Sequence, residues 1–250
     1  MPEAGFLVKK NAHRTRRGGL PLQVAREIAQ RILTGTYPPE QTIPVESVLV
    51  EEFGVSRSAL REAIKLLTAK GLLATRPKLG TQVRPEAQWS HLDPDLLAWR
   101  AELGVEEEFA RHLAEVRQLF ESEAAALAAV RASPAQRQLI LEAVVDMEQA
   151  GSLDQQVAAD LAFHRHILEA AGNPLLLSLG GAVWGALAQS FAAGVKDKDA
   201  WTGALDRHRH VAKAIAAGEP EAARSAMLEI ITRHVDEVGS SRTPREREKR

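Results

Sequence analysis

Residues 45–84 carry the pattern that most restricts how this chain can fold. A short segment, VESVLVEEF, is followed by Gly54 and then by the longer segment VSRSALREAIKLLTAK. Glycine permits a tight turn, and Ser56 is a suitable N-terminal cap for the helix behind it. Two short helices joined by such a turn form a helix-turn-helix. The next segment, LLATRPKLGTQVRP, alternates like two short strands around a glycine-containing tip, which predicts a wing.

The helices of this region have apolar faces with helical spacing. From Leu20 onwards, apolar residues recur at steps of three and four, which predicts a helix that ends near Gly35. In the two helices of the turn, the spacing predicts that the following residues face the core: Val48, Leu49, Phe53, Leu60, Ile64 and Leu67. The opposite face of the second helix carries hydroxyl and basic residues, namely Arg57, Ser58, Arg61 and Lys65.

Charge separates the start of the chain from the rest. Residues 1–85 contain 14 Lys and Arg against 7 Asp and Glu, whereas residues 86–250 contain 18 against 26. A helix fits the major groove of DNA, where arginine can hold guanine, and serine hydroxyls bind phosphate. The wing, with Arg76 and Lys78, can lie against the backbone or the minor groove. An amphipathic helix with ordinary surface arginines is the alternative, but the basic excess, the turn and the wing together favour binding to double-stranded DNA.

The rest of the chain has helical periodicity and no convincing strand. Glycine and proline divide it into segments 105–131, 134–150, 155–171, 174–195, 200–217 and 219–238. The uncharged segment 174–195 is long enough to cross a bilayer, but its polar residues, its glycines and its weakly basic flanks favour a buried helix and no membrane partner. The sequence therefore predicts a mainly α protein, in which an N-terminal winged helix-turn-helix precedes an all-α helical bundle.

These patterns also predict the organisation of the chain. The expected parts are a disordered basic arm (1–19), a winged helix-turn-helix domain (20–85), a linker (86–104), an all-α ligand-binding domain (105–238) and a disordered tail (239–250). Trp89 and Trp99 predict that the linker is ordered and docks on a domain. The chain has no cysteine, which excludes disulfides and thiolate metal sites, and its start lacks the apolar core of a signal peptide. We therefore expect a cytoplasmic protein.

Ionisable residues interrupt the apolar stripes of three predicted helices. They are Arg117 in the first, Asp160 and His164 in the third, and His208 in the fifth. Burying such groups is costly unless they are paired or hold a ligand. Each one alone is best explained as a satisfied core residue, whereas all of them together favour a polar cavity between the helices. A metal-dependent hydrolase that uses Asp160, His164 and His208 is the alternative function, but the chain offers no clear general base, nucleophile pair or phosphate loop for it.

Several segments resemble one family of regulators. TIPVESVLVEEFGVSRSALREAIKLLTAKGLL followed by RPKLGTQV is similar to the DNA-binding domain of the GntR family of bacterial transcription regulators. EVRQLFESEAAALAA, DLAFHRHILEAAGNP and HRHVAKAIAAGEPEAARSAM resemble the FCD ligand-binding domain of its FadR-type branch. The linker segment QWSHLDPDLLAW is most similar to members that respond to sugar acids, such as galactonate regulators. The resemblance extends from about residue 20 to residue 238.

The resemblance implies a bacterial, homodimeric regulator rather than an enzyme. It implies a repressor of a catabolic operon that leaves its palindromic operator when a small carboxylate, such as a sugar acid, binds as effector. The implied DNA contacts are Ser56, Arg57, Ser58, Arg61, Lys78, Gly80 and Thr81. The implied effector contacts are Arg117, which matches an arginine that often holds the carboxylate, and Asp160, His164 and His208. In many members an aspartate and three histidines also bind a divalent metal, and the same Asp160, His164 and His208 match the first three of these ligands.

The chain departs from the family pattern in both parts. Ser47 stands where many members have a DNA-contacting arginine, and Val45 stands where a serine or alanine usually precedes the glutamate. Ile230 occupies the fourth metal-ligand position and cannot coordinate, while His234, one turn further on, is a weak substitute. Three ligands can still hold Zn²⁺ or Ni²⁺ if water or an effector oxygen completes the shell. Alternatively, the three side chains bond effector hydroxyls directly, and the sequence slightly favours this site without a tightly bound metal.

Overall fold

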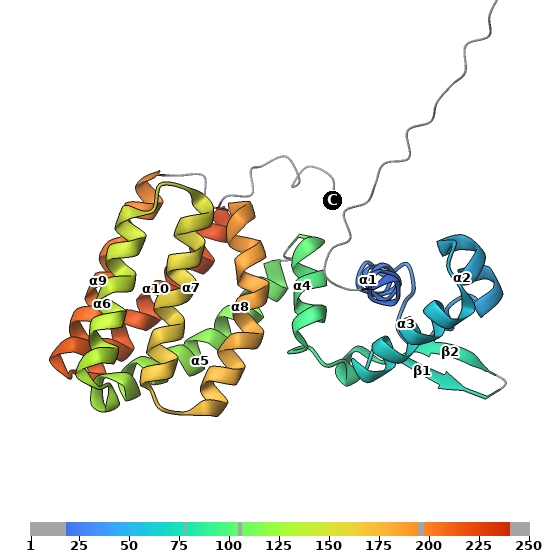
Figure 1. Ribbon diagram of the computed structural model, residues 1–250, viewed down its shortest axis with the longest axis horizontal. Coiled ribbons are helices and arrows are strands. Elements are labelled where there is room, and N and C mark those ends of the chain that lie inside the picture. Colours follow the sequence, from blue (N-terminus) through green and yellow to red (C-terminus); the bar gives the residue numbers. More distant parts are fainter. Residues whose placement is uncertain (1–18, 78, 105–106, 195–197, 241–250) are drawn as a thin grey trace, which may run out of the picture. The chain divides into compact units, whose positions relative to one another are not determined.

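The computed structural model of the chain is mainly helical (Figure 1). It describes residues 19–77, 79–104, 107–194 and 198–240, without the side chains of 107, 185–194, 198–202 and 234–240. The chain divides into two compact units between Ser90 and His91. Most of the predicted basic arm and of the predicted tail lies outside the described residues, and the last helix continues to Ser240.

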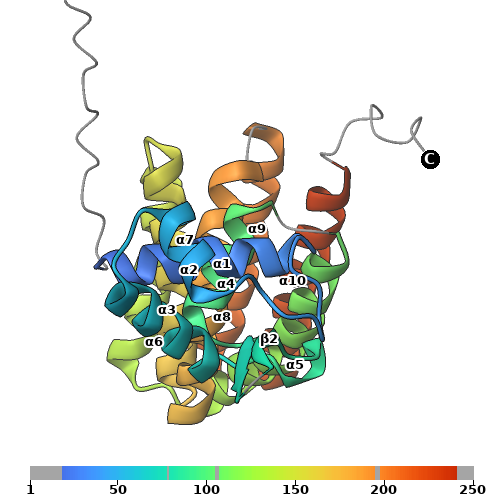
Figure 2. The same ribbon diagram turned by 90° about the vertical axis from the view of Figure 1, so that its right-hand side faces the viewer.

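The first unit is the predicted winged helix-turn-helix. It contains α1 (Leu20–Leu33), α2 (Glu46–Phe53), α3 (Arg57–Ala69), β1 (Leu73–Arg76), β2 (Gly80–Val83) and a 3-10 turn η1 (Glu86–Gln88). The two strands are antiparallel. Gly54, between α2 and α3, has the left-handed conformation (φ +62°) that the tight turn needs. Helix α1 packs against α3 and is seen end-on in Figure 1 and from the side in Figure 2.

The predicted core of this unit is right at Leu49, Leu60, Ile64 and Leu67, but Phe53 is only partly buried and Val48 is exposed. Leu49, Leu60 and Leu67 are fully buried, whereas Val48 is 50% exposed. Helix α2 has only eight residues and buries a single narrow stripe, and Val48 lies about 100° from Leu49 around it. The sequence pattern therefore assigned α2 a wider apolar face than the packing uses.

Helix α4, within the predicted linker, is the element that the sequence pattern missed. It covers Pro94–Glu102 and begins at Asp93, whose carboxylate accepts hydrogen bonds from the amides of Asp95 (3.0 Å) and Leu96 (3.1 Å). Proline at the first helical position is also favourable. Leu96, Leu97 and Trp99 are buried, and the helix packs against α8.

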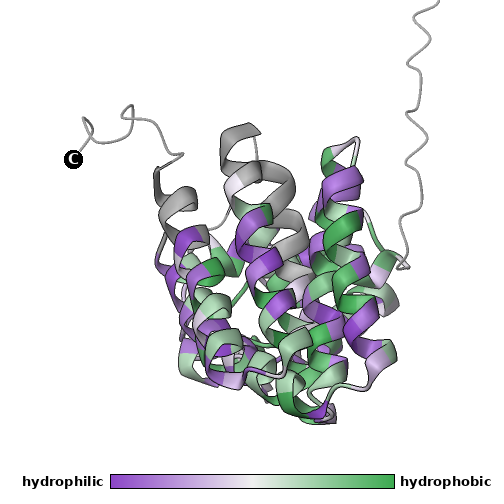
Figure 3. Cartoon of the chain, turned by 90° about the vertical axis from the view of Figure 1, so that its left-hand side faces the viewer, coloured by the Kyte–Doolittle hydropathy of each residue, from purple (hydrophilic) through white to green (hydrophobic). Residues whose placement is uncertain are grey.

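Seven helices are described in the second unit, where the sequence predicts a bundle. After α4 they are α5 (Glu107–Arg131), α6 (Pro134–Gln149), α7 (Leu153–Ala170), α8 (Pro174–Gly194), α9 (Lys198–Ala217) and α10 (Pro220–Ser240). Helix α5 contacts α7, α8, α9 and α10. Figure 3 shows hydrophobic and hydrophilic residues alternating along the outer helices, as amphipathic helices require. Among the described residues, no helix has the length and hydropathy needed to cross a membrane.

Two arginines fix the ends of the helices that carry the interior polar residues. Arg137 of α6 donates to the carbonyl oxygens of Ala129 (3.0 Å) and Ala216 (2.6 Å), near the ends of α5 and α9. Arg131 donates to the carbonyl oxygen of Ala171 (2.9 Å), just past the end of α7. The last carbonyl groups of a helix lack partners within the helix, so these bonds satisfy them. They also hold the ends of α5, α7 and α9 close to the start of α6.

Candidate functional site

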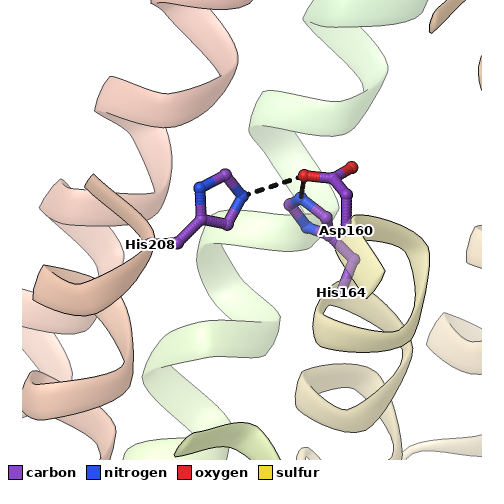
Figure 4. A group of neighbouring side chains, drawn as sticks. All are labelled: Asp160, His164 and His208. Atoms are coloured by element: carbon purple, nitrogen blue, oxygen red, sulfur yellow. Dashed lines mark ion pairs between the residues drawn. The ribbon is translucent and has the colours of Figure 1, made fainter. Parts of the chain in front are cut away.

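Asp160, His164 and His208 meet inside the second unit. Asp160 and His164 lie one turn apart on α7, and His208 reaches them from α9 (Figure 4). Their exposed fractions are only 6%, 2% and 4%. One ligand atom from each residue lies within 4.8 Å of the others. The structure therefore brings together the three residues that the sequence proposed as one cluster.

Each imidazole has an oxygen close to its Nδ1 atom and turns its Nε2 atom toward Asp160. Nδ1 of His208 lies 2.7 Å from the carbonyl oxygen of Ala204, and Nδ1 of His164 lies 2.9 Å from a carboxylate oxygen of Glu121. Both oxygens are acceptors, so each Nδ1 is the protonated nitrogen whenever the ring is neutral, and Nε2 then has a lone pair. Nε2 of His208 is 3.1 Å from Oδ1 of Asp160, and Nε2 of His164 is 4.0 Å from it.

These contacts leave electron-rich atoms facing one another. In the cluster, Oδ2 of Asp160, Nδ1 of His164 and Nε2 of His208 are buried without a well-formed hydrogen bond, although Nδ1 of His164 lies 2.9 Å from Oε2 of Glu121. Phe163 lies edge-on to both imidazoles, with ring centroids 5.5 Å from His164 and 4.9 Å from His208. Because this apolar ring offers no donor, a proton or a cation is needed to relieve the repulsion between the lone pairs.

Glu121 is the member of the cluster that sequence reasoning missed. It is 1% exposed and lies one turn after Arg117 on α5. Its Oε1 is 2.8 Å from Nε of Arg117, and its Oε2 is 3.3 Å from Nη2 of Arg117. Glutamate four residues after arginine is common on helix surfaces. However, Glu121 shares the stripe that Arg117 interrupts, and this spacing was the available signal.

Both carboxylates of the cluster are ionised at neutral pH. Burial alone would raise the pKa of Glu121, but the neighbouring Arg117 and His164 lower it to about 2. Burial likewise opposes ionisation of Asp160, yet the neighbouring His208, His164 and Arg117 lower its pKa well below the usual range. Within this connected group, two carboxylates face one guanidinium. With neutral imidazoles the group carries one excess negative charge, so it attracts cations and disfavours anions.

The structure gives Arg117 a partner within the chain. The family resemblance implied that it holds the carboxylate of an effector, but Nε and Nη2 of its guanidinium are engaged by Glu121. An effector carboxylate would therefore have to share Arg117 with Glu121 or replace it. That Arg117 binds the effector carboxylate therefore stays a prediction, and it requires this sharing or replacement.

Among the described side chains, none near the fourth ligand position of the family's metal site can serve as a further metal ligand. Ile230 is 6% exposed and belongs to the hydrophobic core of the bundle. His234 lies on α10, but its side chain is outside the described residues. His166, away from the cluster's face of α7, is within 3.3 Å of Glu169 instead.

The predicted DNA contacts lie on α3 and on the wing. Arg57, Ser58 and Arg61 are exposed, and the hydroxyl of Ser56 caps α3 by accepting from the amide of Ala59 (3.2 Å). Arg61, which is 64% exposed at its side chain, pairs with Glu46 of α2 at 3.2 Å. Gly80 (φ +87°) and Thr81 form the start of β2. Lys78 lies outside the described residues.

A winged helix followed by a helical bundle with a buried polar cluster defines a class, the bacterial transcription regulators with a separate ligand-binding domain. Residues 20–83 match the bacterial regulatory proteins of the gntR family, and residues 112–233 match the FCD domain. The chain therefore belongs to the GntR family and carries an FCD domain, as the sequence motifs predicted.

Individual relatives agree with this assignment. The chain is 34% identical over 209 residues to the uncharacterized HTH-type transcriptional regulator YieP of Escherichia coli (strain K12), covering 81% of this chain and 88% of the relative. It is 31% identical over 223 residues to the galactonate operon transcriptional repressor of the same organism, covering 84% and 94%. A solved structure of Lar from Listeria monocytogenes has the same fold, with a TM-score of 0.66 at 20% identity over 91% of this chain and 100% of that one.

These comparisons decide between the two classes of function. The matched families and relatives are transcription regulators, so the prediction that the chain is not an enzyme is confirmed. The hydrolase alternative is therefore set aside, and Asp160, His164 and His208 are candidates for ligand binding.

Proposed function

We propose that the protein is a homodimeric repressor of a catabolic operon, and that a small carboxylate releases it from a palindromic operator. The buried cluster in the FCD domain is the observation that carries this proposal. A bundle that needed only stability would bury apolar residues at these positions. The name of the galactonate operon repressor, a relative at 31% identity, supports a sugar acid as the effector. The effector acts by binding more tightly to the state that is unable to hold DNA.

The proposed operator contacts are the residues on the exposed face of α3 and on the wing. They are Ser56, Arg57, Ser58 and Arg61 on the first element, and Gly80 and Thr81 on the second, together with Lys78. The pair between Arg61 and Glu46 is exposed, so its loss on binding DNA has a small energetic effect. Arg57 is the stronger candidate for base contact, because it is the first residue of α3 and is exposed.

Replacing Arg57 by alanine is expected to weaken operator binding by about 1–3 kcal/mol, the value of a good arginine–guanine contact. Fluorescence anisotropy with an operator fragment selected from randomised DNA would measure the effect. The control is Arg111→Ala in the second unit, which removes the same charge from an exposed pair with Glu115. If Arg57→Ala binds the fragment as the unmodified protein does, Arg57 is not part of the base-reading surface.

We further propose a divalent cation as part of the effector site. Asp160, His164 and His208 offer one oxygen and two nitrogens, a set that suits Zn²⁺ or Ni²⁺. The sequence slightly favoured a site without a tightly bound metal. The lone pairs that converge on Asp160 in the structure favour a bound cation instead. When bound, the cation supplies positive charge and a coordination position for an effector oxygen. Ile230, at the fourth position of the family pattern, leaves that position to the effector or water.

The charge of the cluster supports an order of binding. The cluster has one excess negative charge when its imidazoles are neutral, and Arg117 is already paired with Glu121. Its five side chains are those of Arg117, Glu121, Asp160, His164 and His208. A carboxylate is therefore repelled until a cation has bound. The hydroxyl groups of a sugar acid would find further acceptors and donors among the same side chains.

The experiment that tests the function measures release of the protein from its operator. Galactonate and gluconate are added to the preformed complex, either with Zn²⁺ or after treatment with a chelator. We expect a sugar acid to release the protein only in the presence of Zn²⁺, and galactose, which lacks the carboxylate, to leave the complex intact. Equal release by galactose would contradict a carboxylate effector, and equal release in chelator would contradict the role of the cation.

A further inference from the structure

Glu121 connects three helices at the edge of the proposed cation site. Its Oε2 lies 2.9 Å from Nδ1 of His164 on α7. Its Oε1 lies 3.4 Å from the indole nitrogen of Trp184 on α8 and 2.8 Å from Nε of Arg117 on α5. Glu121 is 1% exposed, so water does not compete for these contacts. One buried carboxylate thus accepts from an indole and a guanidinium and lies against the Nδ1 atom of an imidazole.

The surrounding residues keep this carboxylate in place. The indole of Trp184 fits against Gly180, where a Cβ would lie 3.0 Å from two of its ring carbons and would clash with the side chain of Leu168. Any larger residue at position 180 would push the indole away or displace Leu168. Arg117 holds both oxygens from the side, which fixes the plane of the carboxylate. Glu121 therefore presents Oε2 to His164 from a fixed position.

We propose that Glu121 is a positioning residue that holds His164 with Nδ1 protonated, so that Nε2 is the atom presented to the cation. This inference rests on the proposed cation site. A histidine that binds a metal through one nitrogen commonly donates its other N–H to a carboxylate, which fixes the tautomer and raises the basicity of the ring. For His208, the corresponding acceptor is the backbone carbonyl oxygen of Ala204, which lies 2.7 Å from Nδ1. His164 is thus oriented by a side-chain carboxylate and His208 by a backbone carbonyl. Only the carboxylate can be removed by substitution.

The test compares Zn²⁺ binding by the full chain and two variants. Glu121→Gln keeps the size of the side chain but removes its charge, and Glu123→Gln makes the same change two residues away, where the side chain is exposed and pairs with Arg224. Competition with a chromophoric chelator is expected to show that Glu121→Gln weakens Zn²⁺ binding by about 10- to 100-fold, the usual effect of losing such a partner. Glu123→Gln should bind as the unmodified chain does.

A second measurement does not depend on how well the variant folds. ¹⁵N NMR of the imidazoles in the metal-free, unmodified chain reports which nitrogen of His164 carries the proton. We expect Nδ1–H, and a His164 protonated at Nε2 alone would overturn the inference. The inference is also overturned if the unmodified chain binds Zn²⁺ and a folded Glu121→Gln binds it equally well. If the unmodified chain does not bind Zn²⁺ at all, the cation site of the proposed function fails first, and the inference fails with it.

Discussion

Replacing Arg117 by alanine is expected to lower the free energy of unfolding by about 3–5 kcal/mol, the range found when one partner of a buried ion pair is removed. Arg117 and Glu121 have side-chain exposures of only 3% and 2%. Without the guanidinium, the carboxylate of Glu121 stays buried with only an imidazole and an indole as partners. Urea unfolding followed by circular dichroism would measure the change.

A solvent-accessible ion pair between α10 and α5 provides a matched control for this substitution. Arg224→Ala breaks contacts with Glu123 of α5 that are exposed to solvent, so it is expected to change the stability far less. The double variant Arg117→Met, Glu121→Gln removes both charges and should recover part of the loss. If Arg117→Ala is no more destabilising than Arg224→Ala, then Glu121 is not held in a dry interior.

Asp160→Asn is expected to remove the stabilisation that a divalent cation gives to the protein. In protein treated with chelator, the asparagine amide can donate to Nε2 of His208, which now faces Oδ1 of Asp160 at 3.1 Å. This bond offsets only part of the stability that is lost with the ionised carboxylate, because the lowered pKa of Asp160 means that the folded chain favours its charged form. With Zn²⁺ at a hundred times its dissociation constant, the unmodified protein should gain about 2.7 kcal/mol and the variant almost nothing. Thermal unfolding of protein prepared without an affinity tag would measure both differences.

The control for Asp160→Asn is Asp206→Asn. Asp206 lies on α9, exposed, where it pairs with Arg209, so this change should leave the response to Zn²⁺ intact. If Zn²⁺ stabilises Asp160→Asn as much as the unmodified protein, the cation binds elsewhere. If it stabilises neither, the three residues act as direct contacts to an effector, which the sequence slightly favoured.

Periodicity predicted the parts of this fold that repeat over several turns. The helix-turn-helix, the wing and the long helices of the bundle have patterns that alternate or recur at a fixed spacing. Asp160, His164 and His208 stood out because each interrupts such a stripe. Helix α4 has nine residues, and its burial depends on contact with α8, which no local pattern encodes.

Tertiary contacts also explain the limits of the predicted site. Arg117 was correctly placed on an inward face, but its partner could be chosen only once the packing was known. Glu121 was overlooked because an arginine and a glutamate four residues apart are most often a surface pair. This pair is buried because residues of α7 and α8 cover it, and the local sequence does not show which helices will pack there.

Trp184 gives the protein an intrinsic optical reporter. Its indole is 8% exposed and lies 3.4 Å from the carboxylate of Glu121, so its emission depends on the electric field of the interior cluster. The chain contains four tryptophans, and the remaining three can be changed to phenylalanine to isolate this signal. Occupation of the cluster could then be followed in real time, without labels and without DNA.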